Sequence, residues 1–390
     1  MITDVKPYPA YKPSRVPSLG DIPEHWGSER QRHLVQMLVS TVDKHTVEGE
    51  VPVRMCNYVD VYKNERVSAG VPFMRATASR DEVARFRLRT GDVVITKDSE
   101  SWNDIGVPAL VEYESPDLVC GYHLAVLRPR DGRVLPGFLL RALQSQGVAY
   151  QYHVRANGVT RYGLSHDAIK SVVIPTPPPA EQAAIIRFLD YADRRIRRYI
   201  AAKQRLIKLL EEQKQAIIYR AVTRGLDAHV PLKPSGVEWI GDIPKHWRVV
   251  RLKSLARSVT SGSRGWSNFA TDSGALFIRI GNLTRASIDL DLSDVIRLSL
   301  PASVRGEAIR TRVQPSDLLL SITAFIGSVA VVPTGIEEAY VSQHVACCRL
   351  RTGAAEARWV AYVLLSPVGQ VHGKLCMSGG TKQGLSLIHI

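Results

Sequence analysis

The chain has 390 residues and a formal net charge of +14. This length allows two or three domains, and the positive charge favours a polyanionic partner, with nucleic acid preferred over an acidic membrane surface. No stretch approaches the roughly 20 apolar residues that a membrane span needs, and the N-terminus has no apolar segment of the secretory kind. The five cysteines form no Cys-x-x-Cys pair, so a reducing cytoplasm is the simplest setting.

A repeat organises the sequence. The run from Lys12-Pro13-Ser14 to His25-Trp26 returns 221 residues later as the run from Lys233-Pro234-Ser235 to His246-Trp247. The other landmarks that recur at this offset are Gly106 and Gly327, His123 and His344, and Gly163-Leu164-Ser165 and Gly384-Leu385-Ser386. Several landmarks at one offset indicate a tandem duplication.

Each copy is predicted to mix strands and helices. In the first copy we expect strands at 92–95, 109–111, 124–127 and 172–175, and a helix at 138–143. In the second copy we expect strands at 317–322, 329–332 and 345–350, and a helix near 359–365. The intervening residues hardly match, and Glu65 to Arg80 has no evident counterpart in Arg285 to Arg297. Such a pair of scaffolds would suit two recognition modules with different targets.

A long helix is predicted between the copies, from Pro179 to Arg224. Three prolines and Glu181 mark its start, and Gly225 marks its end. Its apolar and long side chains alternate in steps of four and three, which is a heptad seam that needs a partner helix. The seam consists of Ile185, Leu189, Ala192, Ile196, Tyr199, Lys203, Leu206, Leu210, Gln213 and Ile217.

The two copies differ at their ends. The first continues from Gly163-Leu164-Ser165 through a strand into the long helix, whereas the sequence printed for the second stops five residues after Leu385. By the logic of the repeat we expect a final strand and a second long helix to be missing, with residues 387–390 as an aberrant tail. A natural early stop is the alternative to a truncated chain.

Several spaced motifs resemble one family. They are Ile174-Pro175-x-Pro177-Pro178-x-x-Glu181-Gln182 before the long helix, Ala221-Val222-Thr223-Arg224-Gly225-Leu226 at its end, and the run from Ser235-Gly236-Val237 to His246-Trp247. Together they resemble the specificity subunit of a type I restriction-modification enzyme. The resemblance implies an α+β fold with two tandem target-recognition domains separated by a long coiled-coil helix, the second conserved helix being absent here.

The same resemblance implies what each part does. Each recognition domain would read one half of a split double-stranded DNA target, and the helix would set the spacer and dock methyltransferase subunits. Those subunits would bind S-adenosylmethionine and methylate adenine, and a motor-nuclease restriction subunit would use ATP and Mg. The specificity subunit itself would hold no cofactor and catalyse nothing.

The expected boundaries follow from the repeat and the helix. An N-terminal extension occupies 1–11, the first recognition domain 12–178, the helix 179–225, an incomplete second recognition domain 226–386, and the tail 387–390.

The sequence contains no evident catalytic site. There is no Gly-x-x-x-x-Gly-Lys phosphate loop and no Asn-Pro-Pro-aromatic methyltransferase motif. Glu212-Gln213-Lys214 is better explained as a charged helix face than as a nuclease site. His123 and His344 are isolated on strands, so we predict no metal site. A methyltransferase or nuclease acting alone, and a coiled-coil adaptor that never touches DNA, remain the alternative functions.

DNA contacts are expected from loops that follow the landmark strands, where cations reach phosphates and polar groups reach base edges. The candidates are Lys97, Ser99, Trp102, Arg155, Asn157, Thr160, Arg161 and Tyr162 in the first copy, and Arg264, Trp266, Arg279, Asn282, Ser378, Thr381, Lys382 and Gln383 in the second. A capped turn entering the last strand is the alternative for residues 160–163 and 381–384. The helix also carries eleven Lys or Arg against five Asp or Glu between residues 180 and 224, which could follow DNA, meet an acidic partner or face solvent.

Overall fold

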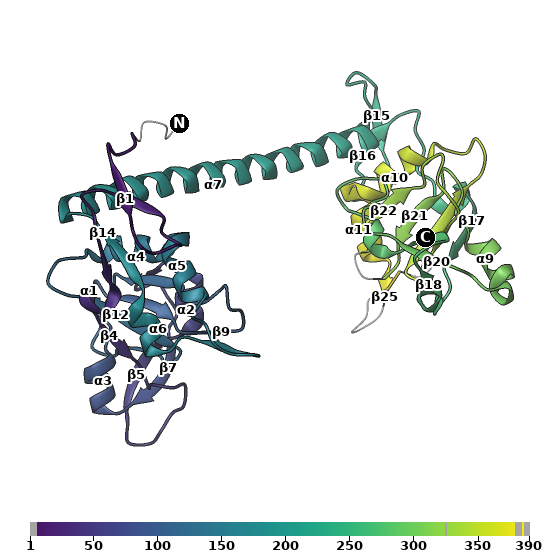
Figure 1. Ribbon diagram of the computed structural model, residues 1–390. Coiled ribbons are helices and arrows are strands. Elements are labelled where there is room, and N and C mark those ends of the chain that lie inside the picture. The colour runs from purple at the N-terminus through teal and green to yellow at the C-terminus, as the bar shows by residue number, and fades with distance from the viewer. Residues whose placement is uncertain (1–5, 324–325, 379–383, 386–390) are drawn as a thin grey trace. The chain divides into compact units, whose positions relative to one another are not determined.

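The structure, a computed structural model, describes residues 6–323, 326–378 and 384–385. The chain divides into two compact units, residues 1–201 and 202–390, and the division falls inside helix α7 (Pro179–Arg224). Each unit mixes strands and helices (Figure 1), which confirms the α+β fold with a long helix between two domains along the chain.

The first unit is built on a five-stranded sheet with strand order β4-β12-β8-β10-β6. A second sheet has the order β11-β5-β7, in which β11 runs parallel to β5. The strands of the two sheets are β4 (Val35–Val39), β5 (Val51–Cys56), β6 (Arg66–Val67), β7 (Met74–Ala78), β8 (Val93–Thr96), β10 (Pro108–Val111), β11 (Leu118–Cys120) and β12 (Leu124–Pro129). The strands expected from residues 92, 109 and 124 onward are therefore confirmed.

Short pairs of strands and short helices complete this unit. The pairs are β1 (Tyr11–Pro13) with β2 (Asp21–Pro23), β3 (Gly27–Arg30) with β14 (Val173–Thr176), and β9 (Asp98–Ser99) with β13 (Tyr162–Gly163). The helices are α1 (Gln31–Leu34), α2 (Tyr58–Lys63), α3 (Arg80–Phe86), α4 (Pro136–Gln144), α5 (Gln146–His153) and α6 (His166–Ser171).

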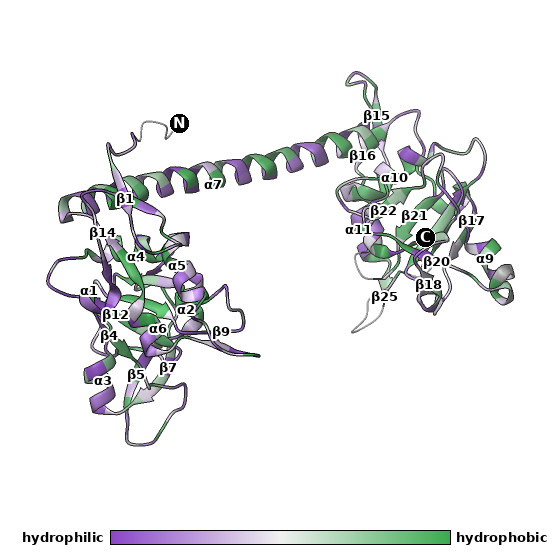
Figure 2. Ribbon diagram, in the orientation of Figure 1, coloured by the Kyte–Doolittle hydropathy of each residue, from purple (hydrophilic) through white to green (hydrophobic). Residues whose placement is uncertain are grey.

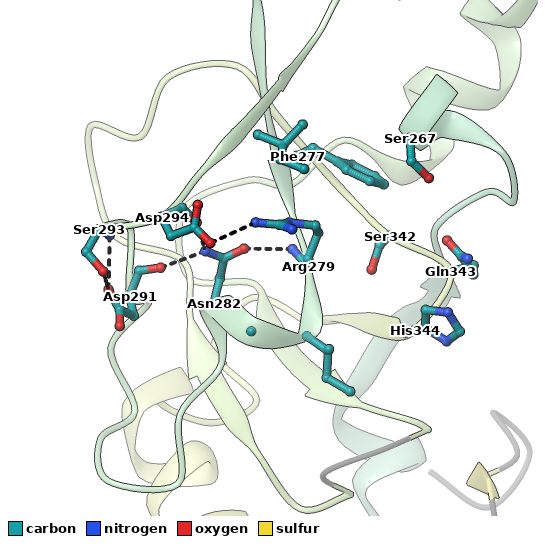
Figure 3. Close-up of a pocket in the computed structure, with 13 residues that line it drawn as sticks. Ser267, Phe277, Arg279, Asn282, Asp291, Ser293, Asp294, Ser342, Gln343 and His344 are labelled. Atoms are coloured by element: carbon teal, nitrogen blue, oxygen red, sulfur yellow. Dashed lines mark hydrogen bonds and ion pairs between the residues drawn. The ribbon is translucent and has the colours of Figure 1, made fainter. Parts of the chain in front are cut away.

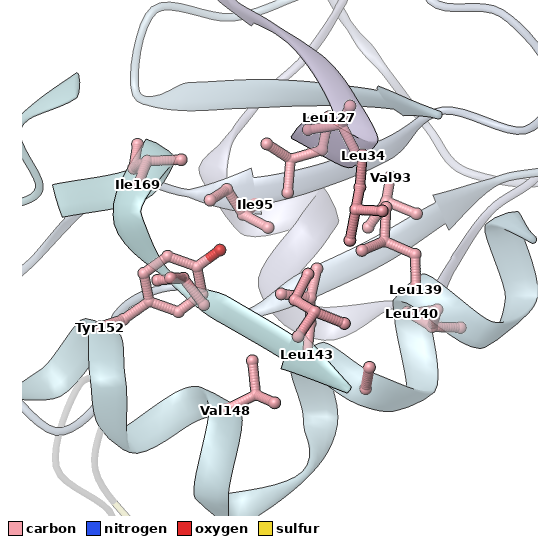
Figure 4. Close-up of a cluster of buried hydrophobic side chains, with 14 of the residues drawn as sticks. Leu34, Val93, Ile95, Leu127, Leu139, Leu140, Leu143, Val148, Tyr152 and Ile169 are labelled. Carbon is pink, nitrogen blue, oxygen red and sulfur yellow. The ribbon is translucent and has the colours of Figure 1, made fainter. Parts of the chain in front are cut away.

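The main core of the first unit lies between the five-stranded sheet and helices α4 and α5 (Figure 4). Val93 and Ile95 come from β8, and Leu139 and Leu143 come from α4; all four side chains are fully buried. Their spacing of two along the strand and four along the helix puts each pair on one face, which is why this sequence forms an interface between a sheet and a helix.

The second unit repeats this architecture. Its sheets have the orders β17-β24-β21-β22 and β18-β20-β19-β23. The first matches β4-β12-β8-β10 of the first unit, and β20-β19-β23 of the second matches β7-β5-β11, with β18 as an additional edge strand. The strands are β17 (Ala256–Ser261), β18 (Ala270–Thr271), β19 (Ala275–Ile278), β20 (Ile296–Leu298), β21 (Leu318–Ser321), β22 (Val329–Val331), β23 (Ala339–Val341) and β24 (Val345–Leu350). The expected strands of the second copy are confirmed.

Further short elements belong to the second unit. They are the pair β15 (Leu232–Pro234) and β16 (Asp242–Pro244), the pair β25 (Met377–Ser378) and β26 (Gly384–Leu385), helices α8 (Leu252–Leu255), α9 (Arg305–Thr311), α10 (Ala357–Leu365) and α11 (Pro367–Leu375), and the 3₁₀ turns η1 (Trp266–Phe269), η2 (Ile280–Asn282) and η3 (Ala302–Val304). The helix expected near residues 359–365 is α10, and Cys347 and Cys348 are buried in β24 as core residues.

A segment without an evident counterpart in the sequence has one in the backbone pairing. The segment from Glu65 to Arg80 does have a structural counterpart, because β7 pairs with β5 as β20 pairs with β19. The correspondence between β7 and β20 is not visible in the sequence, because backbone hydrogen bonds define these strands and the two copies carry different side chains on them.

A buried ion pair recurs in both units. The Asp92 carboxylate receives hydrogen bonds from Arg128 Nε and Nη2 at 2.7 and 2.8 Å, and the Asp317 carboxylate receives them from Arg349 Nε and Nη2 at 2.8 and 2.7 Å. Both carboxylates are about 1% exposed. Fork-shaped pairing of this kind compensates the loss of hydration of a buried carboxylate, so the pair fixes the same two strands in each unit.

Helix α7 begins and ends where the sequence predicts, with Gly225 in the left-handed conformation at φ 77° after its last turn. Glu181 in its first turn accepts hydrogen bonds from His25 Nε2 at 2.9 Å and Trp26 Nε1 at 3.1 Å. The buried Gln182 side chain binds the backbone of the segment before α4. These contacts anchor the start of the helix to the first unit.

Apolar and polar bands alternate along α7 (Figure 2). Ile185 packs against the first unit's core and Ala192 is 9% exposed, whereas Ile196, Leu206, Leu210 and Ile217 are 50, 46, 54 and 61% exposed. In the described part of this chain, the heptad seam from Ile196 onward is therefore largely uncovered.

Candidate nucleic-acid interface

The first unit brings its candidate residues together through the short pair β9 and β13. Tyr162 pairs with Ser99 and Gly163 with Asp98, and the Leu164 N–H donates to Lys97 O at 2.8 Å. Lys97 and Arg161, which are far apart in the sequence, thus lie at one place in the fold.

A charged network connects these residues. Lys97 Nζ and His123 Nδ1 both lie 2.8 Å from Asp98 Oδ2, and Arg161 Nη2 lies 3.5 Å from His123 Nε2. Burial raises the pKa of the Asp98 carboxyl, but hydrogen bonds from Lys97 and His123 outweigh burial and lower the pKa below its usual value. The Asp98 carboxylate therefore pairs with the Lys97 ammonium and orients the His123 ring. Arg161 is exposed and forms no ion pair with Asp98, so a ligand can reach its guanidinium.

The loop 157–163 presents Arg161. The N–H and C=O groups of Asn157 and Gly163 hydrogen-bond each other at 3.1 and 2.9 Å, which closes the loop. Gly158 adopts φ 149°, and a Cβ there would lie 1.9 Å from Arg161 O, so the loop requires glycine. Thr160 is exposed at its tip. Backbone hydrogen bonds close the loop, and Arg161 is exposed on it.

Two remaining candidates of the first unit, Arg155 and Trp102, contact helix α5. Arg155 Nη1 donates to Gln151 O at 2.8 Å, so the Arg155 side chain is held against α5. Trp102 is 48% exposed and meets the ring of His153 edge-on at 6.3 Å between centroids. An exposed aromatic ring of this kind suits contact with sugars or bases.

In the second unit, Thr381, Lys382 and Gln383 lie outside the described residues. Arg264 is exposed on a turn, whereas Trp266 is only 2% exposed and packs against Tyr340. Trp266 is therefore a core residue and its ring faces no ligand.

Arg279 and Asn282 line a cleft of about 570 Å³ (Figure 3). Asn282 is 2% exposed, its Oδ1 accepts from Arg279 N–H, and its Nδ2 donates to Asp291 O and Asp294 O. Since all its hydrogen-bonding groups are engaged, Asn282 shapes the turn and Arg279 is the candidate for contact.

Sequence reasoning missed further polar residues of the cleft, among them Ser267, Ser342 and Gln343. Ser342 and Gln343 directly follow β23, and the repeat offset aligns them with Gly121 and Tyr122 after β11. The pairing of β23 with β19 brings them beside Arg279, and that neighbour relation is invisible in the linear sequence.

Neither a metal-binding cluster nor a membrane-spanning helix occurs in the part of the chain that the structure describes. The described residues contain no group of three or more His, Cys, Asp or Glu side chains placed to hold a metal ion. Among the helices within the described ranges, none is long and apolar enough to cross a membrane.

Two α+β units of one architecture, with a long helix between them in the chain, define a tandem-repeat protein. A family model described as the type I restriction modification DNA specificity domain matches residues 51–209. The putative type I restriction enzyme MjaX specificity subunit of Methanocaldococcus jannaschii is 23% identical over 321 residues, covering 81% of this chain and 70% of that protein. The MjaVIII specificity subunit of the same organism is 28% identical over 114 residues, covering 29% of this chain and 25% of that protein.

Solved structures share the fold. The HsdS subunit from Thermoanaerobacter tengcongensis matches with a TM-score of 0.51 and 19% identity, over 94% of this chain and 86% of that chain. A chain from a structural study of complex assembly and conformational transition of the type I R-M system matches with a TM-score of 0.64 and 19% identity, over 94% and 84% of the two chains. The chain is therefore similar in sequence and fold to DNA specificity subunits of type I restriction-modification systems.

Proposed function

We propose that each unit reads one half of a bipartite double-stranded DNA target. The observation that carries this proposal is that both units share one backbone but present different side chains at matching loops. The turn after β5 is capped by the Asn57 and Asp60 side chains, whereas in the matching turn after β19 the Asn282 side chain accepts a hydrogen bond from the Arg279 backbone N–H and the Arg279 side chain caps nothing. Two scaffolds of one shape with different polar groups would select different bases at two places.

In the first unit, Arg161 is the principal DNA contact, and Lys97, Trp102, Asn157, Thr160 and Tyr162 surround it. Arg161 is exposed on a closed loop, so little conformational freedom is lost when it binds. In the second unit, Arg264 and Arg279 take this role, together with the predicted Thr381, Lys382 and Gln383.

Helix α7 sets the spacing between the half-sites and docks methyltransferase subunits. Leu206, Leu210 and Ile217 form an exposed apolar stripe, and its surroundings carry more Lys and Arg than Asp and Glu. A stripe of this width favours a helical partner over DNA, because DNA offers no apolar surface of matching length. The chain itself is non-catalytic, and S-adenosylmethionine, ATP and Mg belong to the methyltransferase and motor-nuclease subunits.

The test is a selection from random DNA duplexes by the full chain co-expressed with a methyltransferase subunit. Two short conserved tracts separated by a spacer of fixed length are expected. A single continuous tract would overturn the two-reader proposal. Methyl transfer by the purified chain alone would favour the alternative of a self-sufficient enzyme, and binding without salt dependence or sequence preference would favour a structural adaptor.

A further inference from the structure

The cleft of the second unit contains two buried polar atoms that lack partners. In the described part of the chain, the buried side-chain nitrogen and oxygen atoms without a hydrogen bond are Arg141 Nε, Arg279 Nε and Ser342 Oγ. Arg141 is compensated through its other nitrogens, which bind Glu65 and Asp190. Arg279 and Ser342 line the same cleft (Figure 3). Because buried polar groups are nearly always satisfied, two such atoms at one place point to a ligand.

The chemistry of the cleft restricts that ligand. Phe277 and Ile296 supply apolar lining, and Ser342 is 4% exposed. The Asp291 and Asp294 carboxylates also line the cleft, and they would repel a phosphate group. A neutral, planar group with hydrogen-bond acceptors fits these surroundings better than an anion does.

The structure positions the Arg279 side chain but leaves hydrogen-bond donors of its guanidinium available to a ligand. Its backbone N–H donates to Asn282 Oδ1 at 2.8 Å, which fixes the base of the side chain. Its Nη2 lies 3.3 Å from Asp294 Oδ2, and the Asp294 side chain is 90% exposed. An exposed carboxylate at that distance is a weak partner, so a ligand can replace it at small cost.

We infer that this cleft binds the major-groove edge of a guanine, with Arg279 donating to O6 and N7 and Ser342 as a second polar contact. A paired donation from arginine to O6 and N7 is the commonest base-specific contact. The inference deepens the proposed function and rests on it, because it assumes that the second unit reads DNA.

The first unit cannot make this contact at the matching position. Asn57 replaces Arg279 there, and Gly121 replaces Ser342. A Cβ at Gly121 would lie 2.9 Å from Cys56 O, so the first unit leaves little room for a side chain. Guanine reading by this mechanism is therefore confined to one half of the target.

The test compares Arg279→Lys, Ser342→Ala and the control Arg310→Gln in the full chain co-expressed with a methyltransferase subunit, by selection from random duplexes. Arg310 is 64% exposed on α9, outside the cleft. Arg279→Lys keeps the positive charge but removes the planar guanidinium that can donate two parallel hydrogen bonds. The preference for guanine at one position should therefore fall about 5- to 150-fold. Affinity for random duplex and its salt dependence should stay unchanged.

Ser342→Ala gives a second readout. It removes an unpartnered hydroxyl, so the melting temperature of the DNA-free chain should stay equal or rise, while base preference weakens at the same position or its neighbour. A melting temperature several degrees lower would show that the hydroxyl is structural and would contradict its assignment to a base contact.

The outcomes separate the two proposals. If the wild-type chain selects no split sequence, the proposed function fails. If it selects one but Arg279→Lys keeps every base preference, or Arg310→Gln causes the same loss, or the affected base is not guanine, the inference about the cleft alone is overturned.

Discussion

The recurring ion pair allows each unit to be weakened separately. We predict that Asp92→Asn destabilises the first unit by about 3 kcal/mol, near the lower end for breaking a buried ion pair. The carboxylate accepts two hydrogen bonds from Arg128 and a third from Arg89 N–H, and the amide would place donors against these donors. The lower end applies because the Arg128 side chain is 18% exposed and partly hydrated.

Asp317→Asn should act in the same way on the second unit, at about 2 to 3 kcal/mol, since Arg349 is 28% exposed. The matched control is Glu337→Gln, whose carboxylate makes two 2.8 Å hydrogen bonds with Arg297 but is 52% exposed. Because solvent screens this exposed pair, its loss should change stability little.

Urea unfolding followed by hydrogen exchange and mass spectrometry measures both the size and the place of each effect. Asp92→Asn should lower the opening free energy of amides in residues 93–129, and Asp317→Asn that of residues 318–350. The reasoning is refuted if either substitution costs no more than Glu337→Gln, or if the loss of protection spreads equally over both units.

Three other outcomes follow from the structure. Gly106→Ala should destabilise the first unit by about 1–3 kcal/mol in thermal unfolding, because φ is 79° and the new Cβ would lie 2.7 Å from the Tyr152 ring. The control Gly70→Ala, at a glycine with open space around it, should change stability little. Burial raises the pKa of the Glu181 carboxyl, but hydrogen bonds from Tyr8, His25 and Trp26 outweigh burial and lower the pKa below its usual value. The stability that wild type has over Glu181→Gln should therefore be complete above the pKa of an unfolded glutamate and should be lost as pH falls through the folded-state pKa. Urea unfolding at a series of pH values measures this difference. Leu210→Asp should leave the melting temperature of the chain nearly unchanged but weaken methyltransferase binding at least about tenfold in calorimetry, since the Leu210 side chain is 54% exposed.

The elements that depend on local pattern were predictable from the sequence. The start and end of α7, the strands β8, β12 and β24, and the helix α10 follow from runs of apolar residues and from Pro and Gly at their ends. The repeat predicts a second unit like the first, and the matching sheet orders bear this out.

The site depends on contacts between distant residues, and these were harder to predict. The sequence indicates that Arg161 is a cation on a turn, but its neighbours are distant in the sequence. His123, on the turn before β12, is 38 residues from Arg161, and Asp98, on β9, is 25 residues from His123. Asn282 was chosen for its amide, yet burial engages that amide in the turn. Side-chain type alone does not distinguish a group that holds a loop from one that the loop presents.

The most direct test of the account is a binding matrix. The experiment titrates the wild-type chain and its Arg161→Ala variant, each with a methyltransferase subunit, against the selected target and against targets with base changes in one half or the other. The control variant is Arg32→Ala, since Arg32 is an exposed cation on α1. Two separate readers predict that Arg161→Ala removes the penalty for base changes in one half, about 1–3 kcal/mol, and leaves the other half's penalty intact. Equal loss in both halves would contradict the claim that each unit reads its own half-site.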